Sequence, residues 1–322
     1  MKVFIAACLL VAVSATVLEE TGVKFQAFKL KHGKTYKNQV EETARFNIFK
    51  DNLRAIEQHN VLYEQGLVSY KKGINRFTDM TQEEFRAFLT LSSSKKPHFN
   101  TTEHVLTGLA VPDSIDWRTK GQVTGVKDQG NCGSCWAFSV TGSTEAAYYR
   151  KAGKLVSLSE QQLVDCSTDI NAGCNGGYLD ETFTYVKSKG LEAESTYPYK
   201  GTDGSCKYSA SKVVTKVSGH KSLKSEDENA LLDAVGNVGP VSVAIDATYL
   251  SSYESGIYED DWCSPSELNH GVLVVGYGTS NGKKYWIVKN SWGGSFGESG
   301  YFRLLRGKNE CGVAEDTVYP II

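Results

Sequence analysis

No segment of this sequence concentrates lysine and arginine, and the chain of 322 residues has a formal net charge of only −2. Binding to the phosphates of a nucleic acid requires a dense group of basic side chains, so no nucleic-acid partner is expected. After residue 15 no stretch approaches the roughly 20 apolar residues of a membrane-spanning helix, and no membrane anchor is expected either. The chain has no internal repeat, and its 40% hydrophobic residues can form one or two buried cores.

The first apolar run, residues 3–13, is too short to span a bilayer. It follows the positively charged Lys2 and ends at the small residues Ser14 and Ala15, a pattern typical of a secretory signal peptide. We therefore expect residues 1–15 to be a signal peptide that directs the protein into the secretory pathway.

Cysteine is nearly absent from the first part of the chain, where only Cys8 occurs before residue 132. Cys8 belongs to the expected signal peptide, so its removal leaves seven of the eight cysteines. An odd number in an oxidising compartment indicates three disulfides and one free thiol, which raises the question whether that thiol is reactive. The seven are Cys132, Cys135, Cys166, Cys174, Cys206, Cys263 and Cys311.

A polar linker divides the chain into a helical first part and a larger second part. Apolar residues recur at helical intervals over residues 19–65, which predicts a helical hairpin, and a capping box at Thr81 predicts a short helix after it. The sequence SSSKKP at residues 92–97 has no such period and leads towards Val111.

The second part mixes helices with strands. Helices are expected over residues 135–150, from Ser159 through Cys166 and from Ser225 through Val235. Strands are expected over residues 241–247, 272–277, 284–290 and 301–305, which are rich in Val, Ile and aromatic residues. Helices followed by strands predict an α+β protein of two packed lobes, one helical and one a twisted antiparallel sheet or barrel.

The stretch QGNCGSCWAF at residues 129–138 carries the most chemical information. Cys132 and Cys135 also suit a zinc site or a redox-active dithiol. A structural zinc site usually has a second Cys or His pair at similar spacing, which this chain lacks, and a dithiol would leave five other cysteines, again an odd number. A third interpretation puts Cys132 in a disulfide and leaves Cys135 free at the start of a helix, whose dipole stabilises a thiolate.

This stretch resembles the active-site signature of the papain-like cysteine peptidases. The resemblance implies that Cys135 is a nucleophile, with a histidine about 130 to 150 residues downstream and an asparagine beyond it. Of the two histidines after residue 111, His270 lies 135 residues after Cys135 and directly before a strand-like run, whereas His220 is interpreted as a surface or turn residue. Asn290 follows in the sequence KNSWG, which matches the family's pattern.

The resemblance implies acyl transfer through a covalent thioester. The Cys135 thiolate attacks a peptide carbonyl, while His270 holds the proton and returns it to the departing amine. Asn290 orients the imidazole, and Trp292 shields the bond between them from water. The Gln129 side chain and the backbone amide of the nucleophile stabilise the tetrahedral oxyanion.

The resemblance also implies a substrate groove and a specificity pocket, which takes the second substrate residue before the cleaved bond. Close approach of the substrate backbone is expected where glycines leave room, along a wall formed by Gly176, Gly177 and Tyr178. The specificity pocket is expected to be apolar and to be lined by Leu179, Ala244 and Leu268. Asp316 stands at its deep end, where cathepsin L has a small residue, so acceptance of Arg or Lys besides Leu and Phe is expected to rise as this carboxyl group ionises.

Six cysteines pair, by the same resemblance, as Cys132 with Cys174, Cys166 with Cys206, and Cys263 with Cys311. The segment between Cys174 and Cys206 contains no histidine and no long insertion. The occluding loop of cathepsin B is therefore not expected, and an open groove favours endopeptidase activity. Asn269 differs from the Asp that precedes the catalytic histidine in papain, so the pH profile is expected to differ.

The first part of the chain resembles the propeptide of cathepsin L-like proenzymes. Six residues spaced 4, 4, 3, 4 and 4 apart reproduce the first propeptide motif: Glu41, Arg45, Phe49, Asn52, Ile56 and Asn60. The sequence GINRFTD at residues 73–79 reproduces the second. The implied organisation is a helical propeptide at residues 16–110, which blocks the groove until cleavage near Val111, and a mature papain-like domain at residues 111–322. Asn100 is an N-glycosylation acceptor in the removable part.

The resemblance further implies protein and peptide substrates, cystatin-like inhibitors, a monomer, no cofactor and no metal ion, and a lysosomal or an extracellular digestive location. Two other classes of protein were weighed. An inactive relative with a binding or storage role should have lost one of the four residues that carry the chemistry, and all are present: Gln129, Cys135, His270 and Asn290. A free-standing inhibitor with the propeptide fold would end before Val111.

Overall fold

The structure is a computed structural model that describes residues 19–91 and 102–322. The signal peptide expected at residues 1–15 and the glycosylation acceptor Asn100 lie outside the described residues. Within those residues, no helix combines the length and the apolar character that crossing a membrane would require.

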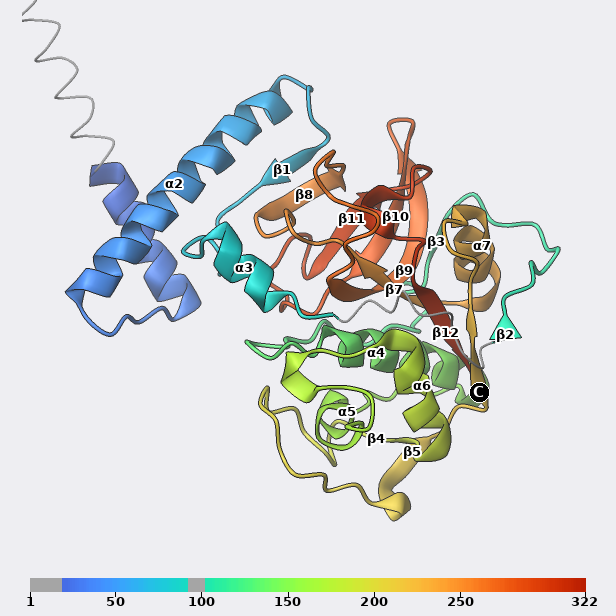
Figure 1. Ribbon diagram of the computed structural model, residues 1–322. Coiled ribbons are helices and arrows are strands. Elements are labelled where there is room, and N and C mark those ends of the chain that lie inside the picture. Colours follow the sequence, from blue (N-terminus) through green and yellow to red (C-terminus); the bar gives the residue numbers. More distant parts are fainter. Residues whose placement is uncertain (1–18, 92–101) are drawn as a thin grey trace, which may run out of the picture.

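Two lobes and a projecting helical unit make up the molecule (Figure 1). The lower lobe in that view is helical, and its elements are α4 (Cys135–Ala152), α5 (Glu160–Cys166), α6 (Leu179–Ser188), β4 (Leu191–Glu192) and β5 (Val213–Thr215). The upper lobe is formed by a twisted sheet with α7 (Glu228–Asp233) beside it. The papain-like α+β architecture expected from the sequence is confirmed.

The sheet of the upper lobe has the strand order β1-β8-β11-β10-β9-β7-β12-β6-β2, with β3 (Ile115–Asp116) paired to β9. Its long strands are β7 (Val241–Ile245), β8 (Tyr253–Tyr258), β9 (His270–Ser280), β10 (Lys283–Lys289), β11 (Tyr301–Leu305) and β12 (Thr317–Ile321). The pairing is antiparallel except for two parallel pairs, β8 with β11 and β6 (Gly219–Ser222) with β2. These two pairs differ from the wholly antiparallel sheet that was expected.

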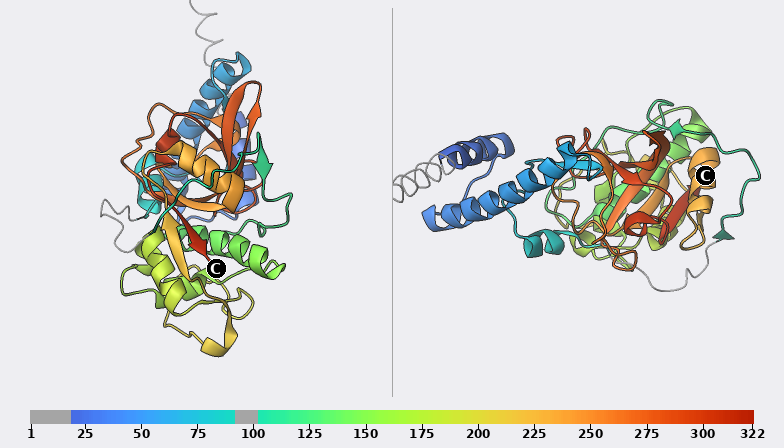
Figure 2. Two further views of the ribbon diagram at one scale, coloured as in Figure 1. Left: turned by 90° about the vertical axis from the view of Figure 1, so that its right-hand side faces the viewer. Right: turned by 90° about the horizontal axis from the view of Figure 1, so that it is seen from above.

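Both ends of this sheet are strands from the first part of the chain. β1 (Tyr70–Lys72) pairs with β8 at one end, and β2 (Thr102–Glu103) pairs with β6 at the other. Figures 1 and 2 show β2 at the opposite end of the molecule from the projecting helices. The segment that is expected to be removed therefore covers both sheet edges, whose unpaired backbone groups would otherwise be exposed.

The expected helical hairpin is present as residues 19–32 and α2 (Gln39–Glu64). An aromatic core holds the two helices together, with Phe25, Phe28 and Phe49 fully buried. Side chains of α2 also fix the segment that follows it. Asn52 donates to the Thr78 and Met80 carbonyls at 2.8 and 2.9 Å.

The capping box expected at Thr81 is confirmed at the start of α3 (Gln82–Phe88), where Thr81 and Glu84 bond reciprocally. Glu84 also accepts two hydrogen bonds from the Arg45 guanidinium, at 2.6 and 2.8 Å. The first propeptide motif is thus joined to the start of α3 through one carboxylate.

The cap expected at Ser225 is wrong. α7 begins at Glu228, and the carboxylate of Asp227 accepts from the next two amides of the helix. Glu226 adopts a φ of 63°, so the chain leaves the helical path directly after Ser225 and that residue cannot cap the helix.

An aromatic cluster docks the propeptide on the sheet lobe. Phe77, Phe85 and Phe88 surround the Trp292 ring, with centroid distances of 5.2, 5.6 and 6.0 Å. Arg76 forms a bidentate ion pair with Asp128 at 2.7 and 2.9 Å. Large buried aromatic surfaces dominate the stability of such interfaces, so this cluster is the principal attachment of the propeptide.

The chain just before Val111 is held separately. His104 is buried between Tyr319 and Asp233, with hydrogen bonds of 2.8 and 2.9 Å. The same Asp233 carboxylate accepts from the backbone and the hydroxyl of Thr107 at 2.8 and 2.6 Å. From there to residue 110 the chain is exposed and forms no helix or strand.

Candidate active site

Two elements from different lobes bring the expected nucleophile and base together. Cys135 is the first residue of α4 in the helical lobe, and His270 is the first residue of β9 in the sheet lobe. Both are fully buried, and the backbone amide next to His270, that of Gly271, hydrogen-bonds the Cys135 sulfur. The backbones are so close that a Cβ on Gly271 would lie 3.2 Å from the Cys135 carbonyl oxygen, so only glycine fits there without displacement.

A single hydrogen bond determines which nitrogen of His270 carries the proton. The Asn290 Oδ1 atom accepts from the Ser291 backbone N–H at 2.8 Å, and a backbone N–H can only donate. The His270 Nε2 atom, 2.8 Å from the same oxygen, must therefore also donate. In the neutral ring this leaves the Nδ1 atom as the acceptor, and among the described residues it has no hydrogen-bond partner.

Burial keeps the two reacting groups neutral in this precursor. It raises the pKa of the Cys135 thiol from 9.0 to about 11, although the amides of Gly271, Trp136 and Cys135 act in the opposite direction. It lowers the pKa of His270 from 6.5 to about 4, against the effect of the Asn290 hydrogen bond. At neutral pH both groups are thus uncharged, and the thiolate expected from the sequence is not the favoured form in this state.

The propeptide crosses the site at this point. Thr90 donates its hydroxyl to the Gly133 carbonyl at 3.1 Å, and Leu91 donates its amide to the Asn269 carbonyl at 3.0 Å. Gly133 lies two residues before Cys135, and Asn269 directly precedes the histidine. The propeptide therefore bonds to both lobes next to Cys135 and His270, where it obstructs the approach of a substrate.

Leu91 belongs to the apolar cluster that contains the residues expected to line the specificity pocket. Its side chain is buried in one apolar cluster with Leu179, Ala244 and the partly buried Leu268. Asp316 is buried beside them, and its carbonyl accepts the Ala244 amide at 2.9 Å. The four residues expected around this pocket are thus brought together, with a propeptide leucine among them.

The expected groove glycines have different physical reasons. Gly176 adopts a φ of 116°, a conformation that side-chain-bearing residues rarely take. A Cβ on Gly177 would lie 2.5 Å from the Asn171 Oδ1 atom and 2.7 Å from the Trp136 ring, so a side chain at this position would clash with the helical lobe itself. Tyr178 follows as the residue before α6, and its amide donates to Asn171 at 2.9 Å.

Gln129 and Trp292 lie next to the reacting pair. Gln129 is buried, and its amide nitrogen donates to the Cys132 carbonyl at 2.9 Å. Trp292 stacks on the His270 ring with centroids 4.6 Å apart and planes 28° apart. His220, in contrast, is not a turn residue: it lies half-buried in β6, and its ring stacks on Phe183 with centroids 5.5 Å apart.

The three disulfides expected from the resemblance are formed, and Cys135 is the free cysteine of the described residues. They join Cys132 to Cys174, Cys166 to Cys206, and Cys263 to Cys311. Because Cys132 is bonded to Cys174, it forms no redox dithiol with Cys135, and the dithiol interpretation is wrong.

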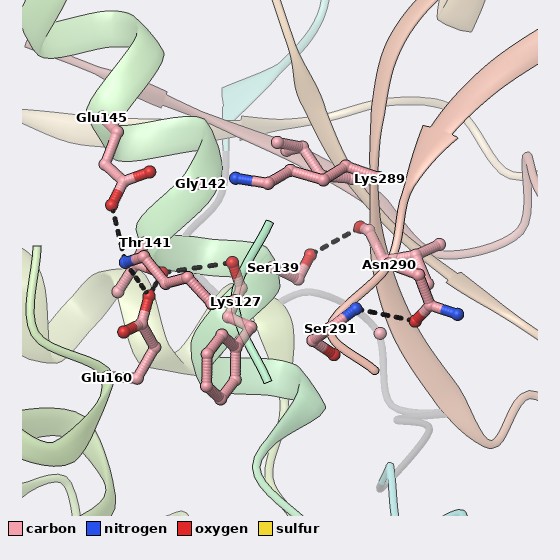
Figure 3. Close-up of a pocket in the computed structure, with 13 residues that line it drawn as sticks. Lys127, Ser139, Thr141, Gly142, Glu145, Glu160, Lys289, Asn290 and Ser291 are labelled. Carbon is pink, nitrogen blue, oxygen red and sulfur yellow. Dashed lines mark hydrogen bonds and ion pairs between the residues drawn. The ribbon is translucent and has the colours of Figure 1, made fainter. Parts of the chain in front are cut away.

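A buried ion network lies beneath the site, around a cavity of about 20 Å³ that also borders Asn290 (Figure 3). The Lys127 ammonium is 2.9 Å from the Glu145 carboxylate and 2.6 Å from that of Glu160. Lys289, the neighbour of Asn290, reaches Glu145 through the Thr124 hydroxyl, with hydrogen bonds of 2.9 and 2.6 Å. The network thus connects α4 and α5 to β10, which carries the asparagine at its end.

The two carboxylates of this network have opposite pKa shifts. The pKa of Glu145 is lowered below 4.5, because the Lys127 and Lys289 charges and several hydrogen bonds outweigh its burial. The pKa of Glu160 is raised, because burial and the Glu145 charge outweigh its bond to Lys127. The folded protein therefore requires the Glu145 charge and tolerates a neutral Glu160.

Sequence reasoning missed this network, the seating of Leu91, and the hydroxyls of Ser291 and Tyr199 that hold Gln129. Only Ser291 had a usable signal, since it adjoins Asn290 in the recognised motif. The charged residues are dispersed between residues 127 and 289 and become neighbours only in the folded chain.

Comparison with known proteins gives the family of the chain. The model of the papain family of cysteine proteases matches residues 111–321, and that of the cathepsin propeptide inhibitor domain (I29) matches residues 25–85. A cathepsin L-like proteinase of Phaedon cochleariae is 46% identical, with all of both chains covered. Digestive cysteine proteinase 1 of Homarus americanus is also 46% identical, with 92% of this chain and 94% of that protein covered.

Solved structures agree. The structure of digestive procathepsin L 3 from the larval midgut of Tenebrio molitor matches with a TM-score of 0.89 and 46% identity, over 94% of this chain and 99% of that one. The protein is therefore a cysteine protease precursor with a propeptide inhibitor domain. Within that class, the chain belongs to the papain family and is cathepsin L-like along its full length.

The ion network generates a prediction about stability. In a Cys135→Ser background, which prevents processing, we expect Glu145→Gln to lower the free energy of unfolding at pH 7 by about 3 kcal/mol, because it leaves two buried ammonium groups without their main partner. The matched variant Glu160→Gln should cost clearly less, because burial and the Glu145 charge raise the Glu160 pKa, so the charged form of Glu160 contributes less to the stability of the folded protein.

The contribution of Glu145 to stability should depend on pH, and the sign of this dependence follows from its pKa shift. A carboxylate with a lowered pKa in the folded state stabilises the protein above its ordinary pKa of 4.5, and this contribution is lost as the pH falls further. The difference between Glu145→Gln and its parent should therefore shrink between pH 5 and pH 3 in denaturant or thermal unfolding. Equal costs for the two variants, or a difference independent of pH, would contradict these assignments.

Proposed function

We propose that Cys135, His270, Asn290 and Gln129 are the catalytic residues of this protease. The thiol gives its proton to the His270 Nδ1 atom, and the thiolate attacks the substrate carbonyl to form a tetrahedral oxyanion. His270 then protonates the departing amine, and water hydrolyses the thioester that remains on Cys135. The Gln129 side chain and the Cys135 amide stabilise the oxyanion, and Trp292 shields the His270–Asn290 bond.

One observation carries this assignment: the bond between His270 Nε2 and Asn290 Oδ1 leaves the Nδ1 atom as the only proton acceptor of the ring. The sulfur lies at the N-terminus of α4 and within reach of the Gly271 amide. Helix termini and backbone amides both favour a thiolate once water can solvate the site. The arrangement therefore fits nucleophilic catalysis with a thiol and an imidazole.

Autoinhibition has a steric and an electrostatic part. The propeptide segment at Thr90 and Leu91 occupies the groove and the specificity pocket. Its presence also excludes water, which disfavours the thiolate–imidazolium pair. We assign residues 16–110 to this inhibitor and residues 111–322 to the mature enzyme. Cleavage near Val111, favoured by acidic pH, is supported by the exposed chain between Thr107 and that residue.

Finer features rest on the relatives. The mature enzyme acts as a monomeric endopeptidase, cystatin-like proteins inhibit it, and Asn100 is glycosylated in the precursor. Its site of action is a lysosome or a digestive lumen; the printed names of the lobster and beetle relatives describe digestive enzymes and support the second.

Acidification of the purified precursor tests the proposed function. We expect it to yield a fragment that begins near Val111. One equivalent of an epoxide inhibitor should inactivate this fragment. Peptide mass spectrometry should locate the adduct on Cys135. Cys135→Ser should neither process itself nor hydrolyse a peptide substrate, whereas a cleaved fragment that stays inactive or carries the adduct on another residue would contradict the assignment.

Asp316 yields a prediction about specificity. Because a carboxylate at the end of an apolar pocket favours a basic side chain, the mature enzyme should accept Arg besides Phe at that substrate position. Asp316→Ala should lower kcat/KM for the Arg dipeptidyl substrate by about tenfold and change that for the matched Phe substrate by less than about twofold. An unchanged Arg-to-Phe ratio in the variant would refute this role.

A further inference from the structure

We propose that Tyr199 is a positioning residue of the oxyanion site, because its hydroxyl links the backbone of Gln129 to Ser134 directly before the nucleophile. The inference rests on the proposed function and assigns a role to a residue that neither lobe's sequence motif contains. The segment from Gln129 to Cys135 is called the oxyanion loop below.

Every polar group of Gln129 except one amide hydrogen is engaged. Ser291 makes two of these contacts. Its carbonyl accepts from the Gln129 backbone amide at 2.8 Å, and its hydroxyl donates to the Gln129 Oε1 atom at 2.6 Å. The Nε2 atom donates to the Cys132 carbonyl at 2.9 Å. The second Nε2 hydrogen remains for an oxyanion, and its direction is fixed by these contacts.

The Gln129 backbone carbonyl accepts from the Cys132 amide at 3.3 Å and also from Tyr199. The Tyr199 hydroxyl donates to this carbonyl at 2.8 Å. A hydroxyl has one hydrogen, so the Ser134 hydroxyl, 2.6 Å away, must donate to Tyr199. One side chain from outside the oxyanion loop therefore connects Gln129, the first proposed donor, to Ser134, which directly precedes the second, Cys135.

The bond to Tyr199 also governs the start of α4. Ser134 is the N-cap residue, a position at which serine usually accepts from the amides of the first turn. Here its hydroxyl makes no such bond, and its backbone has φ −99° and ψ 17° instead of the extended conformation of a capping residue. The Ser134 hydroxyl therefore does not cap the first amides of α4, and these amides remain directed at the thiol and the oxyanion.

Two further contacts make Tyr199 a rigid support. Its ring packs edge to face on Phe138, one turn into α4, with centroids 4.9 Å apart. Its backbone amide donates to the Glu194 carboxylate at 2.7 Å. Burial raises the pKa of its hydroxyl, so this group stays a protonated donor throughout the pH range of the enzyme.

Tyr197 is a matched control in the same loop. It is buried, and its hydroxyl likewise donates and accepts, to the Asp165 carboxylate at 2.8 Å and from the Lys207 amide at 3.0 Å. None of these partners belongs to the oxyanion loop. Tyr197→Phe therefore removes an equivalent buried hydroxyl without touching the proposed donors.

The test compares the activated wild type with Tyr199→Phe and Tyr197→Phe, all quantified by active-site titration. Two peptide ligands are used: an aldehyde, which forms a tetrahedral oxyanion adduct with the thiol, and the corresponding alcohol, which does not. We expect Tyr199→Phe to lower kcat and to weaken the aldehyde by about tenfold each, less than the loss for deleting a donor outright. KM and the affinity of the alcohol should change by less than about twofold.

Tyr197→Phe should alter the aldehyde-to-alcohol ratio by less than about twofold. Should Tyr199→Phe fail to fold, Ser134→Ala takes its place and is expected to shift the same ratio by about threefold. A Tyr199→Phe or Ser134→Ala enzyme with an unchanged ratio, or a Tyr197→Phe enzyme with the same shift, would overturn the inference. Failure of the proposed function gives a different result, because the activated wild type would then not titrate.

Discussion

The hydrogen bond from His270 to Asn290 is the constraint on which the remaining structure depends, because it leaves the Nδ1 atom of the ring as the proton acceptor. The histidine and the asparagine both belong to the sheet lobe, while the thiol belongs to the helical lobe. The reaction therefore requires that the two lobes keep a fixed position relative to each other. The buried charges of Lys127, Glu145 and Lys289 cross the boundary between the lobes directly below the site. These ionic contacts help the apolar packing to hold the two lobes in place.

The precursor already has this geometry, but its propeptide prevents the hydrolytic reaction. The propeptide supplies strands to both ends of the sheet, packs three phenylalanines against Trp292 and passes over the thiol with Leu91 in the pocket. The tryptophan contacts the propeptide on one side and the His270 ring on another, so docking and catalytic geometry share one side chain. A desolvated thiol and a desolvated imidazole both favour their neutral forms. Release of the propeptide therefore gives water and substrate access to the thiol and the imidazole in the same step.

Local sequence signals predicted much of this molecule. The stretch around Cys135, the spacing to His270 and the KNSWG sequence identified residues that the fold brings together, because each of them lies inside a short motif. The start of α7 was misplaced, since a left-handed residue, Glu226, interrupts a sequence that otherwise has the form of a cap. The roles of Tyr199 and Glu145 were not predictable, because their partners lie in distant parts of the sequence and a lone tyrosine or glutamate carries no local pattern.

The most direct test of the central claim is the ultraviolet absorbance of the thiolate, measured from pH 3 to pH 9 as a difference against Cys135→Ser. Cys135 is the free thiol of the described residues, so the signal reports on it alone. The account predicts thiolate in the activated enzyme well below the ordinary thiol pKa of about 8.5, and none in the intact precursor at the neutral to alkaline end of this range, where acid does not process it. Thiolate that forms only near pH 8.5 in the activated enzyme, or equally in both forms, would contradict it.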